Sequence, residues 1–220
     1  MNSTAKKKKK QSNFAYDFVK ITGLIPALIW LRPRIVRASE NVPKKIKGGA
    51  IIAANHTSFL DPIIVHLAFL NRRLYCLATK DLYDTPTKRK FFERMHCIIV
   101  DKENFNMSSL HSVCDRLKEE KLVVIFPEGY VNRKEDTVQD YKSGAVLMAH
   151  IGKKPIVPVY IVKPKRWYNR VTIMIGEPID VASICGIIPT MEKIDQASRF
   201  IRQKEIELAT LYESKFNKEK

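Results

Sequence analysis

Short apolar segments alternate with helix-like segments through most of this 220-residue chain. The predicted strands are residues 50–54, 74–78, 97–100, 122–126, 156–162 and 171–175. The predicted helices are residues 62–70, 87–95, 108–119 and 143–151, with a long amphipathic helix at 191–216. Strands that are apolar on both faces and separated by helices are typical of a parallel sheet covered by helices. The pattern predicts one α/β domain, residues 48–216, with a mostly parallel central sheet flanked by helices.

The chain carries a large excess of positive charge. Lys and Arg total 39 against 23 Asp and Glu, for a net charge of +16. This excess predicts a polyanionic partner, which is nucleic acid, an anionic membrane surface or a phosphorylated substrate. The four cysteines are widely spaced and form no C-x-x-C pair, which predicts reduced thiols and gives no zinc signature.

The first 34 residues combine a basic run with an apolar segment. Residues 1–11 contain five successive lysines and are predicted to be a basic disordered tail. Residues 12–34 are predicted to form an amphipathic helix with Trp30 near its end. Its unbroken apolar part is shorter than the roughly 20 residues of a membrane span, and Asp17 and Lys20 would fall inside a longer one. A helix lying at an anionic membrane surface is therefore predicted; a helix packed on the core is the alternative.

A polar heptapeptide, residues 55–61, interrupts the apolar pattern directly after the first strand of the domain. It contains His56 and Asp61, the pair of residue types that general-base chemistry uses. Five positions apart on one helix, they would lie about 140° apart, so they meet only if the chain turns between them. Asp61 precedes Pro62, which predicts a helix starting at the proline with Asp61 as its N-cap. A simple helix cap and a loop histidine are an equal alternative on these residues alone.

A second polar interruption follows the strand at 122–126. Pro127 and Gly129 flank Glu128 there and predict a turn that presents the carboxylate at the same sheet edge as His56. Cations also recur after successive strands, and they are candidates for holding an anionic head group: Lys80, Lys102, Arg133 and Lys142.

Several common catalytic and binding motifs are absent from the sequence. It contains no G-x-S-x-G elbow, Walker A loop, G-x-G-x-x-G fingerprint or H-E-x-x-H helix. No nucleic-acid recognition module is found either, so nucleic-acid binding rests on net charge alone.

Two motifs in this order, Asn55-His56-x-x-x-x-Asp61 and Phe126-Pro127-Glu128-Gly129, resemble those of the glycerolipid acyltransferase family typified by 1-acylglycerol-3-phosphate acyltransferase. The resemblance runs from about residue 50 to 180. Other matching segments are Lys80-Asp81-Leu82, Val100-Asp101-Lys102, Lys142-Ser143-Gly144, residues 155–159 and residues 176–179. The chain departs from the family pattern at Lys102, where Arg is usual, and at Tyr130 and Val131, where Thr or Ser and then Arg are usual.

The resemblance implies an O-acyltransferase of phospholipid biosynthesis at the cytoplasmic face of a membrane, bound peripherally. It implies His56 and Asp61 as catalytic residues, with Glu128 and Gly129 in the substrate site. The acyl donor is expected to be an acyl-carrier-protein or coenzyme A thioester, and the acceptor a lysophospholipid, most simply 1-acylglycerol-3-phosphate, which would yield phosphatidic acid. Neither a metal nor another cofactor is expected, and nucleic acid is not an expected partner. The alternatives are another acceptor, such as glycerol phosphate or a different lysolipid, and a non-catalytic lipid-binding member of the same fold.

Overall fold

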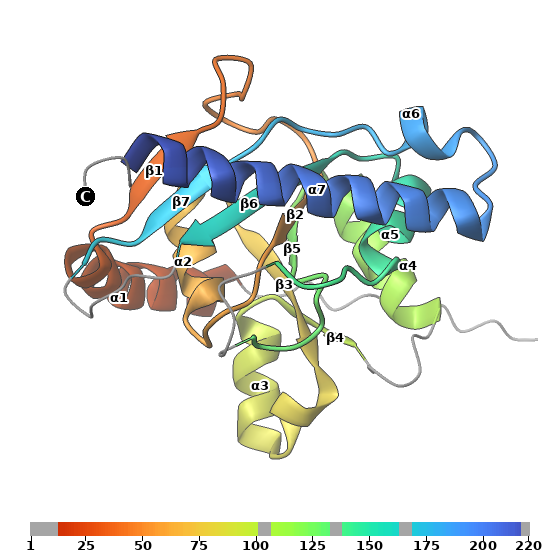
Figure 1. Cartoon of the computed structure of the whole chain (residues 1–220). Coiled ribbons are helices and arrows are strands. Elements are labelled where there is room, and N and C mark those ends of the chain that lie inside the picture. The colour runs from red at the N-terminus through yellow and green to blue at the C-terminus, as the bar shows by residue number, and fades with distance from the viewer. Residues whose placement is uncertain (1–12, 101–106, 133–137, 163–168, 217–220) are drawn as a thin grey trace, which may run out of the picture.

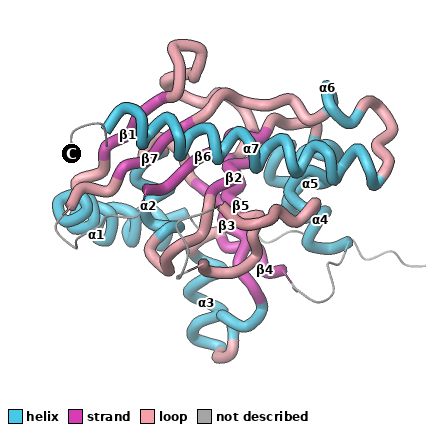
Figure 2. The backbone as a smooth tube through the Cα atoms, in the orientation of Figure 1, coloured by secondary structure: helices cyan, strands magenta, loops and turns pink. Residues whose placement is uncertain are grey.

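The structure is a computed structural model that describes residues 13–100, 107–132, 138–162 and 169–216. Within these residues, seven strands form one sheet in the order β1-β7-β6-β2-β5-β3-β4 (Figures 1 and 2). The strands are β1 (Arg34–Arg37), β2 (Ala50–Ala54), β3 (Leu74–Thr79), β4 (Cys97–Val100), β5 (Leu122–Ile125), β6 (Ile156–Val162) and β7 (Thr172–Ile175). All neighbouring strands are parallel except β6 and β7. The predicted fold class, an α/β domain with a mostly parallel sheet, is confirmed.

Helices cover both faces of the sheet. They are α1 (Asn13–Leu31), α2 (Asp61–Ala68), α3 (Pro86–Arg94), α4 (Met107–Lys118), α5 (Gly144–Gly152), α6 (Ala182–Cys185) and α7 (Met191–Phe216), with a 3-10 turn η1 (Lys80–Tyr83). Successive residues of a strand point to opposite faces. Ile52 of β2 accordingly belongs to the core with α1 and α2, whereas Ile51 belongs to the core with α4, α5 and α7. In Figure 1, α7 crosses one side of the sheet, and α3 projects at the bottom of the view, beside β3 and β4.

The predicted elements are all present, and their bounds differ by at most two residues except at the N-terminal helix, which was predicted to end at residue 34 and ends at Leu31. The sequence did not predict β1, η1 or α6. Strand β1 is an edge strand whose residues alternate between half-buried and exposed, so it lacks the continuous apolar run that marked the other strands. It extends the sheet upstream of residue 48.

Helix α1 packs against the domain through one face and exposes the other. Tyr16 and Leu31 are buried, and the Tyr16 hydroxyl accepts a hydrogen bond of 3.0 Å from the Leu74 amide. Lys20 Nζ donates to the backbone oxygen of Leu70 at 2.6 Å. Large apolar side chains lie exposed on the other face: Phe14, Phe18, Ile21, Ile25, Leu28 and Ile29. Trp30, near the end of the helix, is exposed as well. By length and composition alone, α1 is the one described helix that meets the requirements of a membrane span, which the count of unbroken apolar residues had not indicated.

Candidate active site

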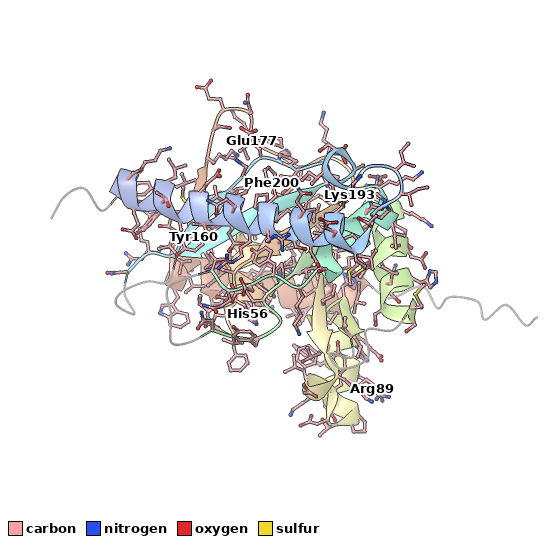
Figure 3. The ribbon with its side chains drawn as sticks, turned by 45° about the vertical axis from the view of Figure 1, so that its right-hand side comes forward. His56, Arg89, Tyr160, Glu177, Lys193 and Phe200 are labelled. Atoms are coloured by element: carbon pink, nitrogen blue, oxygen red, sulfur yellow. The ribbon has the colours of Figure 1, made fainter. Side chains whose placement is uncertain are left out.

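The two predicted motifs meet at the carboxyl ends of β2 and β5. These strands are parallel neighbours with Ala53 opposite Ile125, so the residues that follow them lie side by side. Glu128 Oε1 accepts a hydrogen bond from the backbone N–H of His56 at 3.3 Å. Figure 3 shows His56 inside the body of the molecule, whereas Arg89 lies on the projecting α3. The structure thus joins two motifs that are 72 residues apart in sequence.

His56 and Asp61 form a hydrogen-bonded pair. His56 Nδ1 lies 2.9 Å from Asp61 Oδ2; the Asp61 side chain is 1% exposed and that of His56 is 16% exposed. The same carboxylate oxygen accepts the amides of Thr57 at 2.6 Å and Ser58 at 2.7 Å, which closes the turn between the two residues. Because an ionised carboxylate only accepts hydrogen bonds, the proton of a neutral His56 belongs on Nδ1. Nε2 then carries the lone pair that can take a proton.

The predicted role of Asp61 as an N-cap is wrong. Helix α2 begins at Asp61 itself, Leu60 occupies the cap position, and no side chain caps the helix. The Asp61 carboxylate points back to the amides of the preceding turn and is therefore not available to the helix. Pro62 lacks an N–H, so the first turn has one donor fewer to satisfy.

Two further side chains hold this region in place, and sequence reasoning assigned them no such role. The Phe126 ring stacks on the His56 ring, with centroids 4.2 Å apart and planes 20° apart. Asn55 forms two hydrogen bonds with the backbone of Ile161, at 3.0 and 2.7 Å. The Asn55 side chain therefore links the end of β2 to β6, which is a structural role. The position of Asn55 directly after a buried strand is the sequence feature that could have indicated this role.

Glu128 is a buried carboxyl group on a tight turn. Glu128 is 2% exposed, and burial raises the pKa of its carboxyl group to about 7. The backbone N–H groups of His56 and Gln139 act in the opposite direction. Gly129 has a φ of +78°, which favours glycine, and its N–H donates to the Phe126 oxygen at 3.0 Å. With a pKa of about 7, the Glu128 carboxyl group can either donate or accept a hydrogen bond at neutral pH.

The predicted head-group cations divide into three groups. Lys142 is at the site: a Cβ on Gly129 would lie 3.0 Å from Lys142 Cε, so glycine also makes room for this side chain. Lys80 is exposed at the start of η1, at the same sheet edge but two strands from β2. Lys102 and Arg133 lie outside the described residues. Among the described residues, no group of three or more His, Cys, Asp or Glu is placed to hold a metal ion.

Comparison with known proteins places the chain in a family. Residues 34–162, more than half of the chain, match the family model described as acyltransferase. The chain belongs to the acyltransferase family. This membership confirms the predicted enzyme class, an O-acyltransferase.

Curated relatives of this acyltransferase carry more specific names. The Bacillus subtilis 1-acyl-sn-glycerol-3-phosphate acyltransferase is 30% identical over 174 residues, which cover 77% of this chain and 84% of the relative. A probable enzyme of the same name from Mycoplasma pneumoniae is 30% identical over 155 residues, 66% of this chain and 56% of the relative. The crystal structure of the 1-acyl-sn-glycerophosphate acyltransferase PlsC from Thermotoga maritima has the same fold, with a TM-score of 0.62 at 19% identity; the match covers 89% of this chain and 79% of that one.

Proposed function

We propose that this acyltransferase moves a fatty acyl group from an acyl thioester to the free hydroxyl of 1-acylglycerol-3-phosphate, forming phosphatidic acid for phospholipid biosynthesis. The observation that carries the proposal is the His56–Asp61 pair at 2.9 Å, set against the buried Glu128. The names of the relatives support the choice of acceptor.

His56 acts as the general base. Its Nε2 removes the proton from the acceptor hydroxyl as that oxygen attacks the thioester carbonyl, and Asp61 stabilises the resulting imidazolium. The C–S bond then breaks, and the thiolate of coenzyme A or acyl carrier protein takes the proton from His56. Because the thioester is already activated, the proposed reaction needs no acyl-enzyme, metal or further cofactor. General-base catalysis of this kind contributes roughly 10²–10⁴-fold.

Glu128 orients the acceptor beside the base. A carboxyl group with a pKa of about 7 can exchange a hydrogen bond with a hydroxyl in either protonation state. Lys142 lies over the same turn and supplies positive charge for the phosphate. Lys80 adds positive charge at the same sheet edge. Lys102 and Arg133, outside the described residues, stay candidates for the head group because of their places in the sequence.

The exposed face of α1 would place the site next to the membrane. Tyr16 lies at the start of β3, and the Leu31 oxygen accepts the amide of Val171 at 3.1 Å, beside the carboxyl end of β6. Helix α1 therefore runs toward the sheet edge that holds His56, with Trp30 exposed at that end. The turn before α2 adds the exposed side chains Phe59 and Leu60, and the first turn of α2 adds Ile63, all within seven residues of His56. We propose peripheral binding to an anionic membrane at its cytoplasmic face, where soluble acyl donors are available.

A second acceptor is favoured by one observation. Tyr130 is 52% exposed beside the catalytic turn and donates to Gln139 Oε1 at 3.3 Å, where the family pattern has Thr or Ser. With Val131 following it, this position offers no guanidinium to a phosphate. Glycerol phosphate or another lysolipid is therefore the alternative acceptor.

The test is transfer of a labelled acyl chain by the full-length protein on anionic liposomes, with acyl-carrier-protein and coenzyme A thioesters supplied separately. A panel of lysophosphatidic acid, other lysolipids and glycerol phosphate identifies the acceptor. We expect His56→Ala to lower turnover roughly 10²–10⁴-fold. His111→Ala, on the exposed face of α4, is the matched control and should leave turnover unchanged. Unchanged turnover in His56→Ala would refute the mechanism.

A further inference from the structure

Helix α7 places one carboxyl group in the interior of the protein. Glu205 is fully buried, and it falls in the apolar stripe of the helix, four residues after Ile201 and three before Leu208. Its Oε2 accepts a hydrogen bond from the Tyr141 hydroxyl, and its Oε1 is buried with no hydrogen-bond partner among the described residues. Burial raises the pKa of Glu205 well above its usual range, and the charge of Glu128 raises it further.

Helix α7 holds the segment Val138–Lys142 through side chains on successive turns. Besides the bond from Tyr141 to Glu205, Arg202 donates to the backbone oxygens of Gln139 and Val138, each at 2.9 Å. Ser143, just beyond the segment, bonds to Asp195 at the start of the helix. Side chains of α7 therefore hold this segment in place.

The segment Val138–Lys142 in turn borders the turn that carries Glu128. The Lys142 amide donates to the Pro127 oxygen at 2.9 Å, and Tyr130 reaches Gln139 from the other side. The Gln139 backbone N–H is one of the groups that lowers the pKa of Glu128. The position of Glu128 therefore depends on a segment that α7 holds.

We propose that Glu205 is a positioning residue for Glu128, which it serves by holding the Tyr141 hydroxyl with its buried carboxyl group. Glu205 is the hydrogen-bond partner of the Tyr141 hydroxyl on α7. A buried carboxyl group in an apolar stripe, with one oxygen lacking a hydrogen-bond partner among the described residues, costs stability, which is typical of residues that serve a site. The effect on turnover rests on the proposed function, and the effect on Glu128 does not.

Three variants separate positioning from general destabilisation. Glu205→Leu and Tyr141→Phe each remove the hydrogen bond, and Glu205→Gln keeps an uncharged acceptor for Tyr141. We expect the first two to lower kcat about tenfold with the KM for the thioester within about twofold, the usual effect of one lost buried hydrogen bond in a site. Glu205→Gln should stay within about threefold of the wild-type kcat. Glu207→Leu, at an exposed position two residues along α7, is the control and should change nothing.

Hydrogen–deuterium exchange gives a readout that needs no turnover. The Gly129 and Lys142 amides, which close the Glu128 turn, should exchange about tenfold faster in Glu205→Leu and at the wild-type rate in Glu205→Gln. If Glu205→Leu matches the wild type in both exchange and kcat, or if Glu205→Gln is as impaired as Glu205→Leu, the positioning role is wrong. A wild-type protein without acyl transfer would refute the proposed function, while the exchange rates would still decide the role of Glu205.

Discussion

The two carboxyl groups of the site differ in how the chain satisfies them. Asp61 receives the His56 ring and two backbone amides on Oδ2, while its Oδ1 is buried without a hydrogen-bond partner among the described residues. Glu128 receives the His56 amide at 3.3 Å, and its Oε2 is buried without a hydrogen-bond partner in the described part of the chain. The ionised form of Glu128 is therefore poorly stabilised. This cost falls on a residue that lies beside His56.

The raised pKa of Glu128 predicts that Glu128→Gln stabilises the protein in a pH-dependent way. Between the unfolded pKa of 4.5 and the folded pKa of about 7, the native state holds more protons than the unfolded state, so the free energy of unfolding falls as pH rises. The cost is complete above pH 7 and amounts to roughly 3 kcal/mol. Urea unfolding should show Glu128→Gln equal to the wild type near pH 5 and more stable by up to about 3 kcal/mol at pH 8. Equal stabilities at pH 8 would contradict the assignment.

At the scale of elements, sequence reasoning located features that depend on local pattern and missed those that depend on distant contacts. Strand β2 and helix α7 were predicted with their observed bounds, because continuous or periodic apolar residues mark them. The meeting of His56 with Glu128 followed from both lying after buried parallel strands. Glu205 could not be assigned a role, since its partner Tyr141 lies 64 residues away and the other charges on α7 are accounted for by solvent.

His96 shows the same limit, because nothing near it in sequence indicates its surroundings. Its ring lies between Tyr16 of α1 and Tyr75 of β3, with centroids 4.3 and 4.6 Å away, and both ring nitrogens lack hydrogen-bond partners among the described residues. The residue is 1% exposed, and burial is the main cause that lowers its pKa to about 4. This stack joins α1 to the sheet.

The stack predicts a loss of stability in acid that depends on His96. Between pH 6.5 and 4 the unfolded state binds a proton that the native state does not, so the free energy of unfolding falls by up to about 3 kcal/mol as pH decreases. In His96→Phe this part of the pH dependence should vanish, although the φ of +59° at this position adds a constant cost. Urea unfolding from pH 7 to 4 measures both, and His111→Phe, at an exposed position, should keep the wild-type slope. A wild-type slope in His96→Phe would refute the assignment.

On the scale of the whole molecule, the two faces of the sheet have different surroundings. The face covered by α1 and α2 carries a continuous set of exposed apolar side chains on α1. The opposite face is covered by α4, α5 and the charge-rich α7. The chain combines this apolar surface with a net charge of +16, and the proposed binding to an anionic membrane would use both. Deleting α1 would confound the test of this surface, because Tyr16 and Leu31 belong to the buried core.

Substitution of the exposed face alone separates membrane binding from folding. Ile21, Ile25 and Ile29 are 60%, 53% and 71% exposed, so replacing all three by Ser leaves the core intact. Losing about half the burial value of each side chain should weaken binding to anionic vesicles roughly 100-fold. The melting temperature should stay within about 2 °C. Ile187 and Ile188, before α7 on the opposite face, are 95% and 83% exposed and provide the matched control. Because their replacement by Ser removes comparable apolar surface, an equal loss of sedimentation with vesicles in both variants would show that binding is nonspecific and that α1 is not the membrane-facing element.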